Sequence, residues 1–335
     1  MQYPVLSDGF DANVERADAL IRTLEADGRH AGLLVLPAFS FTGCPETGEQ
    51  AAAMAEAALG RSVQVASDFA TRTGRHVVCS HIERESEQLF HRCVIIEPGG
   101  TVVGAYRQTH LDPSMDWATP GEDLPVFDTA IGRIGMLTNE DARFPEASGV
   151  LAVRRADLIA VPTRWHGTYG GWLHDAAGLF AHRYPTNTMA HWYAIAKTSQ
   201  AYTVVANSVG EGCQGSSGIF TIDPVDSDEP PVVGSIDGTE VVSMQFRTLA
   251  EPTSWMSQER LVGGRRADLA VPVVLDPASS SRSGATRRGT TWGAGRPIGS
   301  DGLAQTDPES FQVAGCAHPA RRCEARSEGL EPPTF

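Results

Sequence analysis

Apolar residues recur along the chain at two spacings, one typical of helices and the other of strands. In segment 13–28, Val14, Ile21 and Leu24 repeat on one helical face, which predicts an amphipathic helix that ends near Gly28. Segment 32–36 is a short continuous apolar run, as in a buried strand. The first elements expected are therefore a helix and then a strand.

Similar patterns predict further elements as far as about residue 250. A helical region is expected at 47–73 with a break at Gly60, another helix between 138 and 157, and a third at 189–201. Short apolar runs predict strands at 76–82, 89–97, 101–106, 132–138, 157–161, 203–206, 218–222 and 240–246. This alternation, mixed with hairpins, favours an α/β or α+β sandwich in which helices cover sheets.

The composition changes near Asp276. From there to Phe335 the chain is rich in Ser, Gly, Arg and Pro and has no periodic apolar face. Such a segment cannot bury enough apolar surface to offset the loss of backbone entropy on ordering. The sequence therefore predicts one folded domain at 1–275 and a disordered tail at 276–335.

The charge balance limits the classes of partner. There are 27 Lys and Arg residues against 41 Asp and Glu residues, which gives a net charge of −14. Nucleic acids and anionic membranes attract positive surfaces, so neither is expected as a partner. No apolar run approaches the roughly 20 residues of a membrane-spanning helix, and no signal peptide is recognised. A cytoplasmic protein is expected.

The six cysteines do not form a metal-binding pattern. None belongs to a CxxC pair, and no cluster of Cys and His has zinc-site spacing. We expect reduced thiols, no metal and no cofactor. The single lysine, Lys197, matters more, because a mechanism that needs a lysine has only this candidate.

Three segments carry chemistry-bearing patterns at strand ends: GLLVLPAFSFTG at 32–43, GGTVVGAYRQTHL at 99–111 and GRIGMLTNEDARFPE at 132–146. Together with ADLIAVPTRW and VVANSVGEGCQGSSGIFTIDP further on, they resemble the nitrilase superfamily of carbon–nitrogen hydrolases. The resemblance covers about 2–275, and the order of five motifs makes it specific. It implies a four-layer αββα sandwich that usually dimerises through helices.

The resemblance also implies a mechanism with a Glu, a Lys and a Cys. A thiolate attacks the carbon of an amide or nitrile, a carboxylate transfers protons, and an ammonium stabilises the charge that develops. In this chain the three matching positions hold Ala38, Gln108 and Asn139. No lysine precedes Lys197, so no shift of the alignment restores the ammonium. The family mechanism is therefore predicted to be lost.

Other family positions are kept or changed. Scaffold residues that match the family are Arg107, His110, Asp141, Arg143, Phe144, Pro145 and Glu146. A second family Glu is absent from SMDWATPG, an Arg of the later helix is replaced by Lys197, and an Asn before the third strand is replaced by His91. The pattern is that of a retained scaffold without its reacting groups.

Two main functional hypotheses follow. The first is a pseudoenzyme that binds a small amide- or carboxylate-bearing ligand through Gln108, Asn139, Glu140 and Trp165, or that assembles as a homodimer or with an active relative. The second is a hydrolase or transferase that acts on carbon–nitrogen bonds through displaced residues, namely Glu140, His110 or Cys44. A purely structural subunit is a weaker third reading. Because a lost nucleophile costs on the order of 10⁶ in rate, the first hypothesis is preferred.

Overall fold

The computed structural model describes residues 1–7, 9–28, 31–165, 190–220, 232–235, 237–246, 248 and 257–269. The chain divides into two units, Met1–Ala270 and Val271–Phe335. Everything below concerns the first unit. The predicted tail at 276–335 lies outside the described residues, so its disorder stays a prediction.

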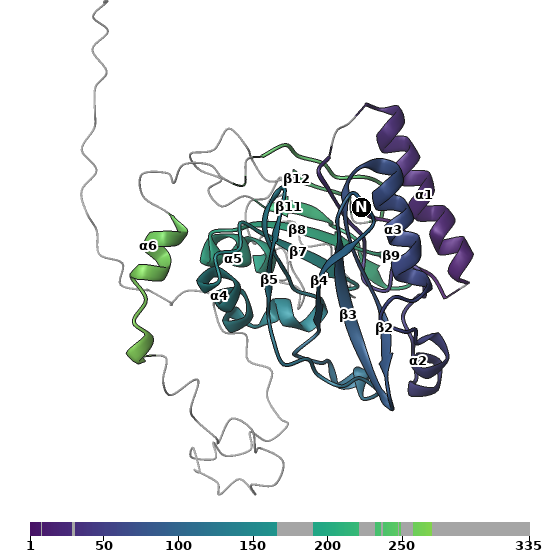
Figure 1. The fold of residues 1–335 in the computed structure, drawn as a ribbon, viewed down its shortest axis with the longest axis horizontal. Coiled ribbons are helices and arrows are strands. Elements are labelled where there is room, and N and C mark those ends of the chain that lie inside the picture. The colour runs from purple at the N-terminus through teal and green to yellow at the C-terminus, as the bar shows by residue number, and fades with distance from the viewer. Residues whose placement is uncertain are drawn as a thin grey trace, which may run out of the picture. The chain divides into compact units, whose positions relative to one another are not determined.

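The first sheet has four strands in the order β1-β2-β3-β4. β1 runs parallel to β2, and the remaining neighbours are antiparallel. Two long helices, α1 and α3, lie side by side over one face of this sheet (Figure 1). The bounds are α1 Phe10–Ala26, β1 Leu33–Val35, α2 Gly48–Met54, α3 Arg61–Thr73, β2 His76–Glu85, β3 Gln88–Ile96 and β4 Val102–Arg107.

The second sheet has six strands in the order β12-β11-β8-β7-β6-β5. Strands β6, β7 and β8 are parallel, so their carboxyl ends meet at one edge. The bounds in this part are η1 Pro113–Met115, β5 Val126–Thr129, β6 Gly132–Met136, η2 Asn139–Arg143, α4 Pro145–Val153, β7 Leu158–Thr163, α5 Ala190–Ser199, β8 Tyr202–Asn207, β9 Val209–Gly210, β10 Cys213–Gln214, β11 Gly218–Phe220, β12 Val232–Val233 and α6 Gln258–Gly263.

Three of the four apolar clusters in the described residues hold these elements together. One joins α1 and α3 to the outer face of the first sheet, with Leu24, Phe69 and Val77 among its buried residues. A second lies between the two sheets, where Val78 and Ile134 are fully buried. The third joins β7, β8 and β11 to α4 and α5. Helices therefore pack on the outer face of each mixed sheet, and the two sheets pack on each other.

Most of the predicted elements are present. The helical region at 47–73 is divided into α2 and α3, and the break lies at 55–60 as the position of Gly60 indicates. The pattern missed β5, which is the antiparallel hairpin partner of β6. No helix in the described part of the chain is long and apolar enough to cross a membrane.

The predicted strand at 240–246 was wrong. Only an isolated bridge between Gln2 and Glu240 forms there. The apolar side chains of this segment pack without a strand ladder: Val241 lies against the cluster under α1, and Phe246 stacks on Tyr202 with ring centroids 4.0 Å apart. Alternating apolar residues thus report side-chain burial here and not strand pairing. The last residues of the predicted strand at 218–222 lie outside the described residues.

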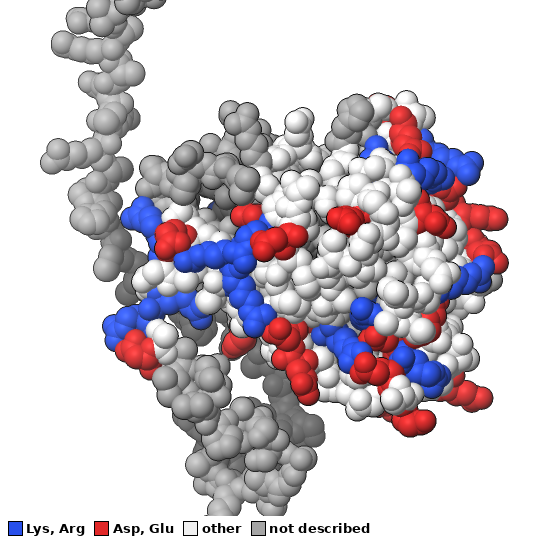
Figure 2. Space-filling view, in the orientation of Figure 1, with Lys and Arg blue, Asp and Glu red and all other residues white. Residues whose placement is uncertain are grey.

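Figure 2 shows no single basic patch on the face that it draws. Lys and Arg side chains lie there among Asp and Glu side chains. Arg72–Asp18 and Arg133–Asp128 are examples of the ion pairs in the described part of the chain. Interspersed charges of both signs give no extended positive field for a polyanion to follow.

Candidate functional site

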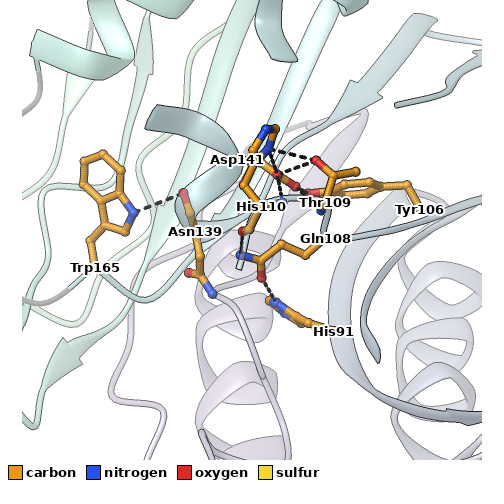
Figure 3. Close-up of polar contacts among 8 residues, drawn as sticks. All are labelled: His91, Tyr106, Gln108, Thr109, His110, Asn139, Asp141 and Trp165. Carbon is orange, nitrogen blue, oxygen red and sulfur yellow. Dashed lines mark hydrogen bonds and ion pairs between the residues drawn. The ribbon is translucent and has the colours of Figure 1, made fainter. Parts of the chain in front are cut away.

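The residues that the family resemblance singles out lie at strand ends, and hydrogen bonds connect them. Ala38 follows β1, Gln108 follows β4, and Asn139 follows β6. Thr163 links two of them, because its carbonyl accepts from the Ala38 N–H at 3.2 Å and its hydroxyl donates to Asn139 Oδ1 at 3.2 Å. Gln108 is connected to the same region through the His110 carbonyl, and the His110 ring pairs with Asp141, two residues after Asn139 (Figure 3). The fold thus brings the predicted positions into one region.

Ala38 lies in an apolar environment. It is fully buried in a cluster with Phe39, Ile82, Leu89 and Met115. The neighbouring Phe39 has φ of 55°, a left-handed conformation that is costly for a bulky residue. Its ring stacks on the imidazole of His91 with centroids 4.1 Å apart. An ionised carboxylate at position 38 would therefore face mainly carbon atoms.

Gln108 is fully buried and both ends of its amide are used. Oε1 accepts from His91 Nδ1 at 2.7 Å, and Nε2 donates to the His110 carbonyl at 2.7 Å. On the far side of the imidazole, His91 Nε2 lies 2.9 Å from Ser80 Oγ, which in turn accepts from the Phe39 N–H. This assignment makes His91 a neutral donor at Nδ1 and an acceptor at Nε2. Burial agrees with it, since it lowers the pKa of His91 to about 4.

Asn139 sits at a tight turn between β6 and η2. Its φ of 44° is left-handed, a conformation that Asn tolerates better than most residues. Oδ1 accepts from the backbone N–H of Arg164 at 2.9 Å as well as from Thr163. The indole of Trp165 donates to the Asn139 carbonyl at 3.3 Å. Asn139 is half-buried, and its Nδ2 has no hydrogen-bond partner among the described residues.

Asp141 is the most heavily hydrogen-bonded side chain of the region. Its carboxylate is fully buried and accepts five hydrogen bonds. The donors are the Tyr106 hydroxyl, the hydroxyl and backbone N–H of Thr109, and the backbone N–H and Nδ1 of His110. The carboxylate therefore fixes the segment that follows β4 and the turn that follows β6 against each other.

The two other displaced candidates are less favourably placed. Glu140 forms an ion pair with Arg143 at 2.8 Å, which uses its carboxylate. Burial raises the pKa of the Cys44 thiol, although Arg164 opposes the shift. A thiol held protonated is a poor nucleophile. Trp165 is buried against Trp192, with ring centroids 4.2 Å apart, so its main contacts are with the core.

A metal centre and an internal cavity are the other kinds of site to compare with this region. The described residues contain no group of three or more His, Cys, Asp or Glu side chains that could hold a metal ion. A cavity of about 470 Å³ is lined by β1 and by apolar residues such as Leu24, Ile131 and Phe246, and by none of the candidate site residues. Neither feature adds a functional group to the site.

The profile of the carbon–nitrogen hydrolase family matches residues 1–267. This chain belongs to that family. The match agrees with the resemblance inferred from the five motifs, and it covers the whole first unit except its last residues.

Individual relatives match over shorter stretches. The probable nitrilase C965.09 of Schizosaccharomyces pombe is 27% identical over 163 residues, which cover 47% of this chain and 59% of the relative. A nitrilase of Pyrococcus abyssi is 33% identical over 156 residues, 45% of this chain and 58% of the relative. The omega-amidase NIT2 of Danio rerio is 29% identical over 169 residues, which cover 47% of this chain and 60% of the relative. The chain thus spans about three fifths of these carbon–nitrogen hydrolase relatives.

Solved structures show the same fold. A double mutant of the amidase from Nesterenkonia sp. AN1, in complex with acrylamide, has a TM-score of 0.59 and 19% sequence identity. The match covers 80% of this chain and 93% of that one. The same amidase after tag removal also gives a TM-score of 0.59, at 20% identity, over 80% and 96% of the two chains. At this identity the likeness concerns the fold alone: a nitrilase-like α/β fold with two mixed sheets.

Sequence reasoning missed two roles in the site. His91 was identified only as a departure from the family pattern, and its pairing with Gln108 depends on the register of β3 and β4. Asp141 was treated as a scaffold residue, whereas the structure places it on His110 Nδ1. The sequence does hold a signal for the contact between Asp141 and His110. A Thr-His pair after one strand and an Asp after another suit a shared hydrogen-bond network.

Proposed function

We propose that this carbon–nitrogen hydrolase family member does not hydrolyse amides or nitriles by the family mechanism and instead binds a small amide- or carboxylate-bearing ligand. One observation carries the proposal. At the position of the family lysine, Gln108 is engaged at both ends in a buried chain of neutral hydrogen bonds with His91 and His110. Position 108 therefore supplies no ammonium to stabilise a developing negative charge.

The other two positions support the same conclusion. Ala38 offers no carboxylate, and its surroundings are apolar. Asn139 cannot act as a nucleophile, because its nitrogen lone pair is delocalised into the carbonyl. Losing the nucleophile alone costs on the order of 10⁶ in rate in comparable hydrolases, and further losses in the same unit add little.

The ligand contact that the geometry supports best is Asn139. Its Nδ2 is a donor without a partner in the described part of the chain, while Oδ1 is held by Arg164 and Thr163. A fixed amide donor suits the carbonyl oxygen of an amide or the oxygen of a carboxylate. Gln108 supports the neighbouring segment through its hydrogen bond to the His110 carbonyl. Glu140, paired with Arg143, and Trp165, whose indole donates to the Asn139 carbonyl, are the other proposed ligand contacts.

We further infer that the layers form a four-layer αββα sandwich, and that two copies associate in the cytoplasm. Helix α4 supports the dimer. Apart from Glu146 and Ser148 its residues are apolar or Gly, and Val150 and Val153, three residues apart on one face, are 37% and 44% exposed. Exposed apolar side chains that lie together favour contact with another protein surface, so a second copy is expected there. An active relative is the alternative partner.

Two measurements test the proposed function. Native mass spectrometry of freshly purified protein is expected to show a bound small molecule that is lost in Asn139→Ala and kept in Gln64→Ala, a control that removes an exposed amide on α3. Steady-state assays with acetamide, butyramide and acetonitrile are expected to match buffer. Turnover of any of these amides or nitriles that is abolished by Cys44→Ser or Glu140→Gln would refute the proposal and establish a displaced active site.

A further inference from the structure

His110 differs from the other histidines that the structure describes. Its Nδ1 lies 2.7 Å from the Asp141 carboxylate, and its side chain is 35% exposed. His91 is buried with both nitrogens engaged, and His81 is buried with no partner for either nitrogen. His191 is half-exposed and has no carboxylate partner within the described residues. His76 has its Nδ1 near the Gly32 carbonyl but is buried. Among the histidines that the structure describes, His110 alone combines an anchored nitrogen with an accessible ring edge.

The hydrogen bonds to Asp141 determine the tautomer of this ring. Every neighbour of the carboxylate is a donor, including the Thr109 hydroxyl, which lies 2.7 Å from Oδ1. Burial, reinforced by the Asp141 charge, raises the pKa of the Tyr106 phenol well above its ordinary value, so this hydroxyl stays protonated and donates. His110 Nδ1 must therefore carry its proton toward Asp141, which leaves a lone pair on Nε2.

Nε2 is free to react. It has no hydrogen-bond partner among the described residues, whereas Nδ1 has two neighbours, Thr109 and Asp141. Phe144 stacks on the imidazole with centroids 3.9 Å apart, and 39% of Phe144 is exposed. The ring stack fixes the plane of the imidazole and offers an apolar surface for an aromatic group.

We propose that His110, oriented by Asp141, is a general base that catalyses the hydrolysis of activated aryl esters by direct attack of water. The water oxygen forms a bond to the acyl carbon while its proton passes to Nε2. The aryloxide leaves with the bonding electron pair, and the proton returns from Nε2 to solvent. The products are the carboxylic acid and the phenol, and no acyl-enzyme forms.

Aryl esters are the substrate class because their leaving group needs little assistance. An aryloxide departs without prior protonation, whereas the nitrogen of an amide must receive a proton and its tetrahedral intermediate needs stabilisation. The site lacks an ammonium for that purpose, since Gln108 is neutral. This activity goes beyond the proposed ligand binding and does not depend on it.

The test is steady-state hydrolysis of p-nitrophenyl acetate by the full chain. His110→Gln is expected to lower kcat/KM by about 10², the lower limit for loss of a general base. His191→Gln is the matched control, a half-exposed histidine without a carboxylate, and is expected to keep the wild-type rate. Circular dichroism is the control that checks whether both variants fold.

Asp141 is tested as a positioning residue by a second readout. Nitrogen-15 NMR of the wild type is expected to show the proton of His110 on Nδ1. In Asp141→Ala the acceptor that holds the proton on Nδ1 is removed, so a mixture of the two tautomers is expected and the ester rate falls toward that of His110→Gln. If Asp141→Ala does not fold, the His110→Gln rate and the wild-type tautomer decide alone.

Three outcomes would overturn this inference. They are an unchanged ester rate in His110→Gln, a wild-type proton on Nε2, and an acyl-enzyme trapped by hydroxylamine. These results are distinguishable from failure of the proposed function, because amide turnover or the absence of a bound ligand would leave the ester result unaffected.

Discussion

The substitution Gln108→Lys tests most directly whether the neutral network has replaced a charged site. A lysine could still donate to the His110 carbonyl, but it could not accept from His91 Nδ1, whose donor lies 2.7 Å from Oε1 in the wild type. The variant would thus leave one buried N–H unsatisfied, at a cost of about 1–3 kcal/mol. It would also place an unpaired ammonium at a fully buried position.

The second cost is the larger one. An uncompensated buried charge destabilises a protein by roughly 3–5 kcal/mol, and a fall in the pKa of the amine limits the penalty. We therefore expect Gln108→Lys to lower the free energy of unfolding by about 4 kcal/mol and the Tm by roughly 8–16 °C. Gln108→Met has a similar length but no charge, so it is expected to show only the cost of the lost hydrogen bonds.

A carboxylate at position 38 should recover part of the stability that Gln108→Lys loses. Ala38→Glu alone is expected to destabilise, because the cluster around Ala38 is apolar. If positions 38 and 108 face the same site, the double variant will be more stable than the sum of the single effects by about 1–3 kcal/mol. Urea unfolding of the wild type and the three variants measures this coupling. Zero coupling, or a Gln108→Lys variant as stable as the wild type, would refute the placement of the two motifs.

The exposed face of α4, the buried histidines and the composition of the tail lead to three other predictions. Sedimentation equilibrium is expected to show a dimer at micromolar concentration that Val153→Glu dissociates; a wild-type monomer would contradict the interpretation of α4. Burial lowers the pKa of His91 to about 4 and of His81 to about 3, so the unfolded state binds these protons first and stability is lost as the pH falls below about 6.5. Each histidine adds up to about 1.4 kcal/mol per pH unit to the pH dependence of the free energy of unfolding. His91→Asn is therefore expected to reduce the change of the urea midpoint between pH 6.5 and 4. An unchanged pH dependence would show that His91 is not protonated on unfolding. Deleting 276–335 is expected to leave the Tm unchanged within error, whereas a fall of several degrees would mean that this segment packs on the domain.

Local patterns were sufficient for the elements that bury one continuous face. The spacing of Leu24 and its neighbours located α1, and the apolar runs located the strands of the parallel core. The same patterns failed at 240–246, because burial by side chains on two clusters resembles the alternation of a strand. The five motifs identified the family because their order, and not any single motif, is specific.

The hydrogen-bond partners within the site could not be read from local patterns. His91 and Gln108 are 17 residues apart, and His110 and Asp141 are 31 residues apart. The first pair depends on the antiparallel register of β3 and β4, and the second depends on how the two sheets pack. Spacing along the chain therefore located the candidate residues but could not say which of them share a proton.

The turn at Asn139 shows how stability and lost chemistry can be connected. Left-handed backbone costs on the order of 1–2 kcal/mol for most residue types, and Asn is among the few that tolerate it. At a φ of 44°, Asn139 also accepts hydrogen bonds at Oδ1 from the Arg164 backbone N–H and the Thr163 hydroxyl. A cysteine in the same conformation would bear the strain without an equivalent pair of hydrogen bonds, since sulfur is a weak acceptor. Asn139 thus fits the turn better than the family nucleophile would, just as Gln108 fits its buried neighbours better than a lysine would. Positions 108 and 139 thus hold neutral groups that fit their surroundings, and the pair of His110 with Asp141, in which the imidazole stays accessible, is where remaining chemistry should be sought.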